Sequence, residues 1–125
     1  MAQTTLKPTE SELEILQVLW EKNPASVREV HEIIAEKKDC GYTTTLKLMQ
    51  IMHDKGLVSR DDSSKVHWYK PEVSREATQQ QLVGKMVNDL FAGSAGSLVM
   101  QVLGNNKPSS EELDAIEALI RQLKK

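Results

Sequence analysis

Hydrophobic residues recur every three or four positions along most of this chain, and turn-forming residues separate one such stretch from the next. This spacing is typical of amphipathic helices. The capping-box pattern Thr9-x-x-Glu12 opens the first stretch. A second capping box, Ser26-x-x-Glu29, opens the next, which is expected to run to about Lys38. The pattern therefore predicts two short helices at the start of the chain.

The third stretch runs from Tyr42 to Gly56, and its two predicted faces differ in chemistry. Hydroxyl groups at residues 43–45 are expected to cap the first turn of this helix, and Gly56 to end it in a left-handed conformation. A helix pair joined by a tight turn is the helix-turn-helix arrangement. We interpret the third stretch as a recognition helix that lies in a DNA groove. At about 100° per residue, one face holds Thr45, Leu48, Met49 and Met52, and the other holds Thr43, Thr44, Lys47, Gln50 and Asp54.

The periodicity changes after the third helix. Residues 57–60 and 66–70 are rich in β-branched, aromatic or alternating apolar residues, and a turn-forming Asp-Asp-Ser-Ser sequence separates them. This predicts a hairpin with a polar tip. Three helices followed by a two-stranded hairpin make a winged helix, so residues 1–71 are expected to form a winged helix-turn-helix DNA-binding domain.

Residues 72–125 are predicted to form a separate, helical dimerisation domain. Helices are expected over 73–91 and 98–103, and a third follows the capping-box pattern Ser109-x-x-Glu112. Three short helices bury little surface alone, so we expect their apolar faces to meet a second copy of the chain. The alternative is that they pack back on their own winged helix. The residues assigned to the dimerisation surface are Leu82, Met86, Leu90, Phe91, Leu98, Val102, Leu113, Ile116 and Ile120.

Composition narrows the class of protein. The predicted fold is mainly α with a small β-hairpin. Hydrophobic residues make up 39% of the chain but aromatic residues only 4%, so the core must be mostly aliphatic and methionine side chains. A small core of this kind is often completed by oligomerisation. No apolar run reaches the roughly 18 residues of a membrane span, and the N-terminus has no signal-peptide core. Cys40 is the single cysteine. We therefore expect a soluble, cytoplasmic protein without membrane insertion.

The net charge of -2 is unfavourable for binding to phosphate, but the charge is unevenly distributed. Residues 42–70 hold five Lys or Arg against three Asp or Glu, a net charge of +2. The alternative explanation is that the net charge of a segment varies by this much by chance. Lys47 and Gln50 are the candidates for reading base edges, because Lys pairs with guanine and Gln with adenine. The full set of predicted DNA-binding residues is Arg28, Tyr42, Thr43, Thr44, Lys47, Gln50, Arg60, Lys65 and His67.

Other chemistry finds little support in the sequence. The three histidines, His31, His53 and His67, lack the spacing of a metal site, so we expect no metal and no cofactor. Cys40 precedes the third helix, where its oxidation could perturb DNA binding or where it simply packs as a small residue. Clustered glutamates lie in helix first turns, where the helix dipole explains them. With no nucleophile elbow, phosphate loop or acid–base pair, the chain is not expected to be an enzyme.

The sequence resembles the penicillinase-repressor family of winged-helix regulators (BlaI/MecI/CopY-like). The matching motifs are L-x-P-T-E-S-E-L-E-I-L-x-x-L-W from Leu6, V-R-E-V from Val27, and Y-T-T-T-L-K-L-M-x-x-M-x-x-K-G-L-V from Tyr42. The resemblance covers essentially the whole chain. It implies a homodimeric repressor that binds a palindromic double-stranded DNA operator in the major groove and controls resistance or stress genes.

The resemblance also implies a mode of release. Many members are paired with a membrane sensor-protease and leave DNA when the repressor is cleaved. The Asn-Phe step cut in staphylococcal relatives falls at Gln101-Val102 here. Copper-responsive members carry C-terminal cysteine pairs that this chain lacks, so copper control is not expected.

Two functions remain open at this point. One is a sequence-specific dimeric repressor, and the other is a winged-helix adaptor that binds proteins without contacting DNA directly. Duplex affinity that depends on sequence and falls steeply with salt distinguishes the first from the second.

Overall fold

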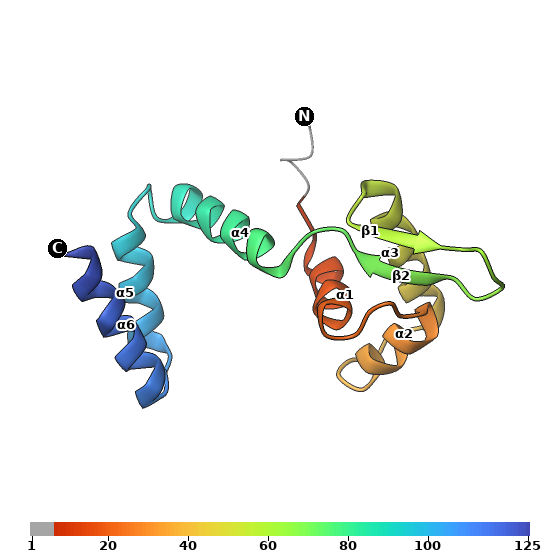
Figure 1. The fold of residues 1–125 in the computed structure, drawn as a ribbon, viewed down its shortest axis with the longest axis horizontal. Coiled ribbons are helices and arrows are strands. Elements are labelled where there is room, and N and C mark those ends of the chain that lie inside the picture. Colours follow the sequence, from red (N-terminus) through yellow and green to blue (C-terminus); the bar gives the residue numbers. More distant parts are fainter. Residues whose placement is uncertain (1–6) are drawn as a thin grey trace. The chain divides into compact units, whose positions relative to one another are not determined.

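The computed structural model describes residues 7–125, which divide into two compact units, one up to Leu82 and one from Val83 to Lys125. Figure 1 shows the order of the elements along the chain. The described residues form helices α1 (Glu10–Glu21), α2 (Val27–Ala35), α3 (Tyr42–Lys55), α4 (Arg75–Leu90), α5 (Ala95–Asn105) and α6 (Ser110–Leu123), with strands β1 (Val58–Asp61) and β2 (Trp68–Pro71) between α3 and α4.

Two predicted capping boxes open the first two helices. The Thr9 amide donates to Glu12 Oε1 at 2.9 Å and the Glu12 amide donates to Thr9 Oγ1 at 3.2 Å. Ser26 and Glu29 make the same reciprocal pair at 3.0 and 3.2 Å. Both predictions are confirmed. Helix α2 ends at Ala35, three residues before the predicted limit, because the next amides fold back on Ile33 and Ile34 in a turn.

The start of α3 differs from the prediction. Gly41 is the residue that precedes the first turn, and no side chain caps that turn, so the expected capping by the hydroxyls of residues 43–45 is wrong. Thr45 is buried and its hydroxyl lies 3.0 Å from His31 Nδ1 of α2. Its hydroxyl therefore joins the two helices of the helix-turn-helix. At the other end, Gly56 adopts the predicted left-handed conformation, with φ of 86°.

The hairpin β1–β2, called the wing below, is antiparallel with Val58 opposite Pro71 and Arg60 opposite Tyr69. Tyr69 also exchanges two backbone hydrogen bonds with Ala25, at 2.8 and 3.0 Å. Ala25 immediately precedes the cap of α2. The backbone of the wing is thereby tied to the start of the helix-turn-helix.

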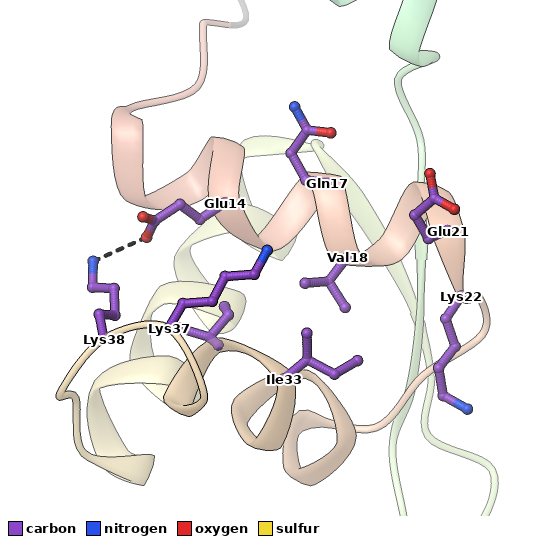
Figure 2. A pocket seen from close by; sticks show the side chains of 9 residues that line it. Glu14, Gln17, Val18, Glu21, Lys22, Ile33, Lys37 and Lys38 are labelled. Atoms are coloured by element: carbon purple, nitrogen blue, oxygen red, sulfur yellow. Dashed lines mark hydrogen bonds and ion pairs between the residues drawn. The ribbon is translucent and has the colours of Figure 1, made fainter.

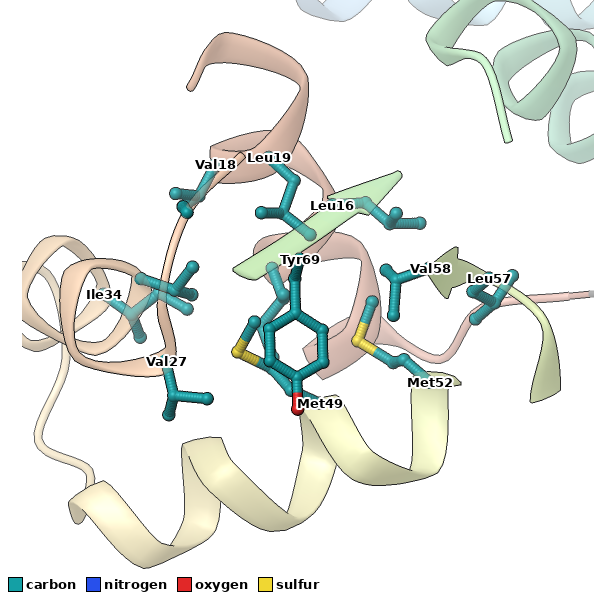
Figure 3. Packing of buried hydrophobic residues seen from close by; sticks show 13 residues of the cluster. Leu16, Val18, Leu19, Val27, Ile34, Met49, Met52, Leu57, Val58 and Tyr69 are labelled. Atoms are coloured by element: carbon teal, nitrogen blue, oxygen red, sulfur yellow. The ribbon is translucent and has the colours of Figure 1, made fainter. Parts of the chain in front are cut away.

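The core of the first unit lies where α1, α2, α3 and the wing meet. Met49 and Met52 of α3 are fully buried, and Tyr69 of β2 turns its ring toward them (Figure 3). Aliphatic and methionine side chains supply most of this core, as the low aromatic content predicted. Its members are Ile15, Leu16, Val18, Leu19, Ala25, Val27, Val30, Ile34, Met49, Met52, Leu57, Val58 and Tyr69.

The chain that follows the wing packs against α1. Trp20 Nε1 donates to the Val73 carbonyl at 2.9 Å, and Arg75 pairs with Glu21 at 2.6 Å while its guanidinium lies over the Trp20 ring. Thr78 is buried in the first turns of α4. The start of α4 thus belongs to the same compact unit as the winged helix, and the functional boundary near residue 71 stays a prediction.

The second unit contains the end of α4 with α5 and α6. Ser94 caps α5, so this helix begins earlier than the predicted 98–103. It also ends later, at Asn105. The third predicted capping box is confirmed, with Ser109 and Glu112 paired at 2.9 and 3.0 Å. No residue of α5 or α6 is buried. This unit therefore has no core of its own within a single chain.

The first unit is a winged helix, with three helices followed by a two-stranded antiparallel hairpin. None of the helices in residues 7–125 is both long and apolar enough to cross a membrane.

Truncation of the core methionine on α3 is expected to destabilise the protein. Met49→Ala removes a fully buried side chain and leaves a cavity, so the free energy of unfolding should fall by about 2–5 kcal/mol. The neighbouring Gln50→Ala, on the exposed face of the same helix, should change it by less than about 0.5 kcal/mol. Urea unfolding followed by circular dichroism measures both. Equal losses for the two variants would contradict the assignment of faces.

Candidate nucleic-acid interface

One face of α3 packs in the core, and the opposite face is exposed to solvent. Thr43, Thr44, Lys47, Gln50 and Asp54 are all exposed, as the periodicity predicted. The buried face, with Met49 and Met52 at its centre, holds the helix against α1 and the wing. The polar side chains are therefore presented to solvent on a rigid element.

A concave surface of about 530 Å³ lies beside this face, between the start of α2, α3 and the wing. We call it the α2–α3–wing cavity. Thr43, Thr44 and Lys47 lie outside it on the exposed face of α3. Six of the nine predicted DNA-binding residues line it: Arg28, Tyr42, Gln50, Arg60, Lys65 and His67.

Tyr42 is held at one edge of this cavity by two residues of α2. The Arg28 guanidinium lies 5.8 Å from the centre of the Tyr42 ring, and His31 meets the same ring edge to face with centroids 5.6 Å apart. Tyr42 remains 41% exposed. An aromatic ring and a cation are thus fixed together at the start of α3.

Positive charge dominates the cavity. Arg28, Arg60 and Lys65 line it with one carboxylate, Glu29, which is already engaged by its own capping box and lies 3.6 Å from Lys22. Arg60 is also paired with Asp62 of the wing tip, at 3.5 Å. A hydrogen bond with the Tyr69 hydroxyl raises the pKa of Arg60 further, so its guanidinium is charged throughout the physiological range. The Arg60 Nε atom is buried without a hydrogen-bond partner among residues 7–125.

The tip of the wing is ordered by a local turn. The Ser63 amide donates to Asp61 Oδ1 at 3.0 Å. Hydrogen bonds from the Ser63 hydroxyl and then from its amide lower the pKa of Asp61, so the carboxylate that accepts them is ionised at neutral pH. Lys65 follows this turn and lines the α2–α3–wing cavity together with residues of α3.

Glu12 fixes the far end of α3. Its carboxylate is almost completely buried, and besides closing the capping box of α1 it accepts a hydrogen bond from Lys55 Nζ at 2.7 Å. The sequence predicted Lys55 only as a favourable charge at the helix C-terminus. The contact with Glu12, 43 residues earlier, sets where that end lies.

Three residues of this region escaped the prediction. Trp68 and Val66 of the wing line the cavity, and Ile51 is 37% exposed on the polar side of α3. The helical spacing that defined the polar face also places Ile51 on it, so that signal was present in the sequence. Among residues 7–125 there is no group of three or more His, Cys, Asp or Glu arranged to hold a metal ion.

Fold and site together define a winged-helix protein with a cationic cavity beside an exposed polar helix. The sequence model of the penicillinase repressor family matches residues 8–122, and the chain belongs to that family.

Relatives resemble the chain over nearly its full length. It is 19% identical to the penicillinase repressor of Staphylococcus aureus, over 100% of this chain and 99% of that one. It is 22% identical to the methicillin resistance regulatory protein MecI of Staphylococcus aureus strain N315, over 98% and 99%. It is 26% identical to the transcriptional regulator BlaI of Mycobacterium tuberculosis, over 87% and 79%. The solution structure of the DNA binding domain of the repressor BlaI aligns with a TM-score of 0.49 and 19% identity, over 56% of this chain and 90% of that one.

The hydrogen bond between the two helices of the helix-turn-helix can be tested directly. Thr45→Val keeps the shape of the side chain but removes the hydroxyl that hydrogen-bonds with His31, so the free energy of unfolding should fall by about 1 kcal/mol. Thr43→Val, on the exposed face, should change it by less than about 0.5 kcal/mol. Urea unfolding measures both variants, and a larger loss for Thr43→Val would refute the role given to Thr45.

Proposed function

We propose that this chain is a sequence-specific transcriptional repressor that binds a palindromic operator as a homodimer. The observation that carries the proposal is the cationic α2–α3–wing cavity beside the exposed polar face of α3. An α-helix fits the major groove of B-DNA, and cations that flank it neutralise neighbouring phosphates. The names of the relatives, which include repressors and a transcriptional regulator, support the same function.

The side chains on α3 have different roles in DNA binding, according to their chemistry. Lys47 and Gln50 read base edges, because an ammonium pairs with guanine and an amide grips adenine through two hydrogen bonds. Ile51 offers an apolar contact to a thymine methyl group. Thr43 and Thr44 hydrogen-bond to phosphate or base edges near the helix N-terminus.

The side chains around α3 position the protein on the duplex. Arg60, Lys65 and His67 of the wing region contact the phosphates that flank the groove. Arg28 and Tyr42, already in contact with each other, form the edge of the same surface at the start of α3. These contacts carry affinity and fix register, whereas α3 supplies the specificity.

Dimerisation rests on the second unit. Of the thirteen large hydrophobic side chains exposed in the described residues, ten lie beyond Leu82. Apolar surface of this extent is typical of an interaction site. A second copy would cover it, and two-fold symmetry would place two α3 helices on the two halves of a palindrome. Of the residues predicted for this surface, Met86, Leu90, Val102, Leu113 and Ile120 are exposed, and Leu82, Phe91, Leu98 and Ile116 are half-buried.

Release from DNA by proteolysis, triggered by a membrane sensor-protease, is the mode of control that we carry over from the family. The corresponding bond, Gln101–Val102, lies inside α5, and both residues are exposed. Exposure gives a protease access, but a protease cleaves an extended backbone, so α5 would have to open locally first. Its two glycines, Gly96 and Gly104, lower the cost of that opening.

The experiment that tests the proposed function is fluorescence anisotropy of the full chain on the DNA upstream of its own gene. A scrambled duplex of the same length is the control, and both are measured at two salt concentrations. Tight, salt-dependent binding to the upstream DNA alone, with two protomers per site, is expected. Weak and equal binding to the two duplexes would favour the adaptor function instead.

Lys47→Ala separates base reading from phosphate binding. We expect affinity for the operator to fall by about 1–3 kcal/mol, with little change on the scrambled duplex, because a base contact is lost. Lys65→Ala, on the wing, should weaken binding to both duplexes equally and reduce the slope of log affinity against log salt by about 1. If Lys47→Ala also weakened both equally, Lys47 would be a phosphate contact.

A charge on the apolar face of α6 should prevent dimerisation. Ile120→Glu places an unpaired carboxylate in the proposed interface, so sedimentation velocity should show monomers where the native protein shows dimers. Gln122→Glu adds the same charge on the other side of α6 and should leave the dimer intact. A dimer that survives Ile120→Glu would contradict the assigned interface.

A further inference from the structure

A pocket of about 400 Å³ between α1 and α2 takes no part in the proposed function. Its floor is apolar: Val18 of α1 and Ile33 of α2 point toward each other (Figure 2), and Ile34 of α2 also lines it. Charged and amide side chains surround that floor. They are Glu14, Gln17, Glu21, Lys22, Lys37 and Lys38.

The shape of this pocket suits a small molecule. Val18 and Ile34 are each only 8% exposed, so the apolar floor is recessed below the charged rim. The volume lies within the range of about 300–1,000 Å³ that is usual for small-molecule sites.

The charges around the rim favour an anion. Glu14 is paired with Lys38 at 2.9 Å and Glu21 with Arg75 at 2.6 Å, so both carboxylates are neutralised by neighbours. Lys37 lies in the turn after α2 and extends toward α1 (Figure 2), and it has no ion pair among residues 7–125. One cation is therefore available directly above an apolar floor.

We propose that this pocket binds a small organic acid with an apolar body and one carboxylate. The apolar body would lie on Val18 and Ile33, and the carboxylate would accept hydrogen bonds from the Lys37 ammonium. Charge-assisted hydrogen bonds of this kind are stronger than neutral ones, so Lys37 supplies the selectivity for an acid over a neutral analogue.

The pocket is connected to the DNA-binding helix. A second cavity, of about 60 Å³, shares Glu14, Ile34 and Lys38 with the first and is also lined by Thr44 and Thr45 in the first turn of α3. A ligand that moves Ile34 or the Glu14–Lys38 pair therefore changes the packing beneath α3. The ligand would act as an effector of operator binding, a part of the inference that rests on the proposed function.

Binding is tested on the full chain without DNA, with 2-naphthoate as the probe and methyl-labelled protein observed by NMR. The Val18, Ile33 and Ile34 methyl signals should shift on titration. Lys37→Gln should weaken binding about 10-fold, because one charged hydrogen-bond donor is lost. Lys125→Gln, an exposed lysine in the second unit, is the matched control and should bind as the native protein does.

The neutral analogue 2-naphthylmethanol completes the test. It should bind the native protein more weakly than 2-naphthoate does, and it should bind Lys37→Gln and the native protein equally. Equal affinity of 2-naphthoate for all three proteins, shifts confined to methyl groups of α5 and α6, or no binding at millimolar probe would each overturn the proposed site.

Operator binding is measured separately by anisotropy. Saturating 2-naphthoate should change the operator affinity of the native protein about 5-fold or more, and Lys37→Gln should need about a 10-fold higher concentration of 2-naphthoate for the same change. Binding of 2-naphthoate without any change in operator affinity would overturn the effector role. Failure of the native protein to bind any specific duplex would instead count against the proposed function, and the NMR result on the pocket would stand.

Discussion

The arrangement of the winged helix depends on the contacts of one buried residue, Tyr69. Its backbone pairs with Arg60 across the wing and with Ala25 ahead of α2, and its ring lies in the core with Met49 and Met52 of α3. One residue therefore places the wing, the start of α2 and the buried face of α3 relative to one another. The α2–α3–wing cavity is the space that these three placements leave open on the surface.

The exposed face of α3 can remain free of internal contacts because both ends of the helix are fixed elsewhere. Thr45 contacts His31 of α2 near the N-terminus, and Lys55 bonds to the buried Glu12 of α1 near the C-terminus. Between these points the core methionines hold the middle of the helix. The polar side chains are left available for an external partner, and their positions are set by contacts on the opposite face.

Local features of the sequence predicted local structure well. The three capping boxes, the polar tip of the hairpin and the division of α3 into two faces depend on residues a few positions apart, and all three predictions are confirmed. The predicted cap of α3 was wrong because Gly41 holds the cap position and residues 43–45 already lie inside the helix, where Thr45 contacts a residue 14 positions away. The Arg28–Tyr42 contact and the cavity also depend on tertiary packing. Sequence could name residue types suited to DNA but could not show that six of them line one surface.

The net charge of -2 is compatible with a DNA-binding surface because several acidic residues outside that surface are already engaged within the protein. Glu12, Glu14, Glu21 and Glu29 serve as helix caps or ion-pair partners on α1 and α2. Residues 42–70, which form α3 and the wing, hold five Lys or Arg against three Asp or Glu, and Arg60 is paired with Asp62. At physiological salt, charges more than about 8–10 Å away are largely screened, so a phosphate would respond to the local cations rather than to the sum. A modest total charge also limits non-specific attraction to DNA, and a repressor must find its operator among about 10⁶–10⁹ competing sites. On the proposed function, the mildly acidic composition would therefore favour specificity over raw affinity.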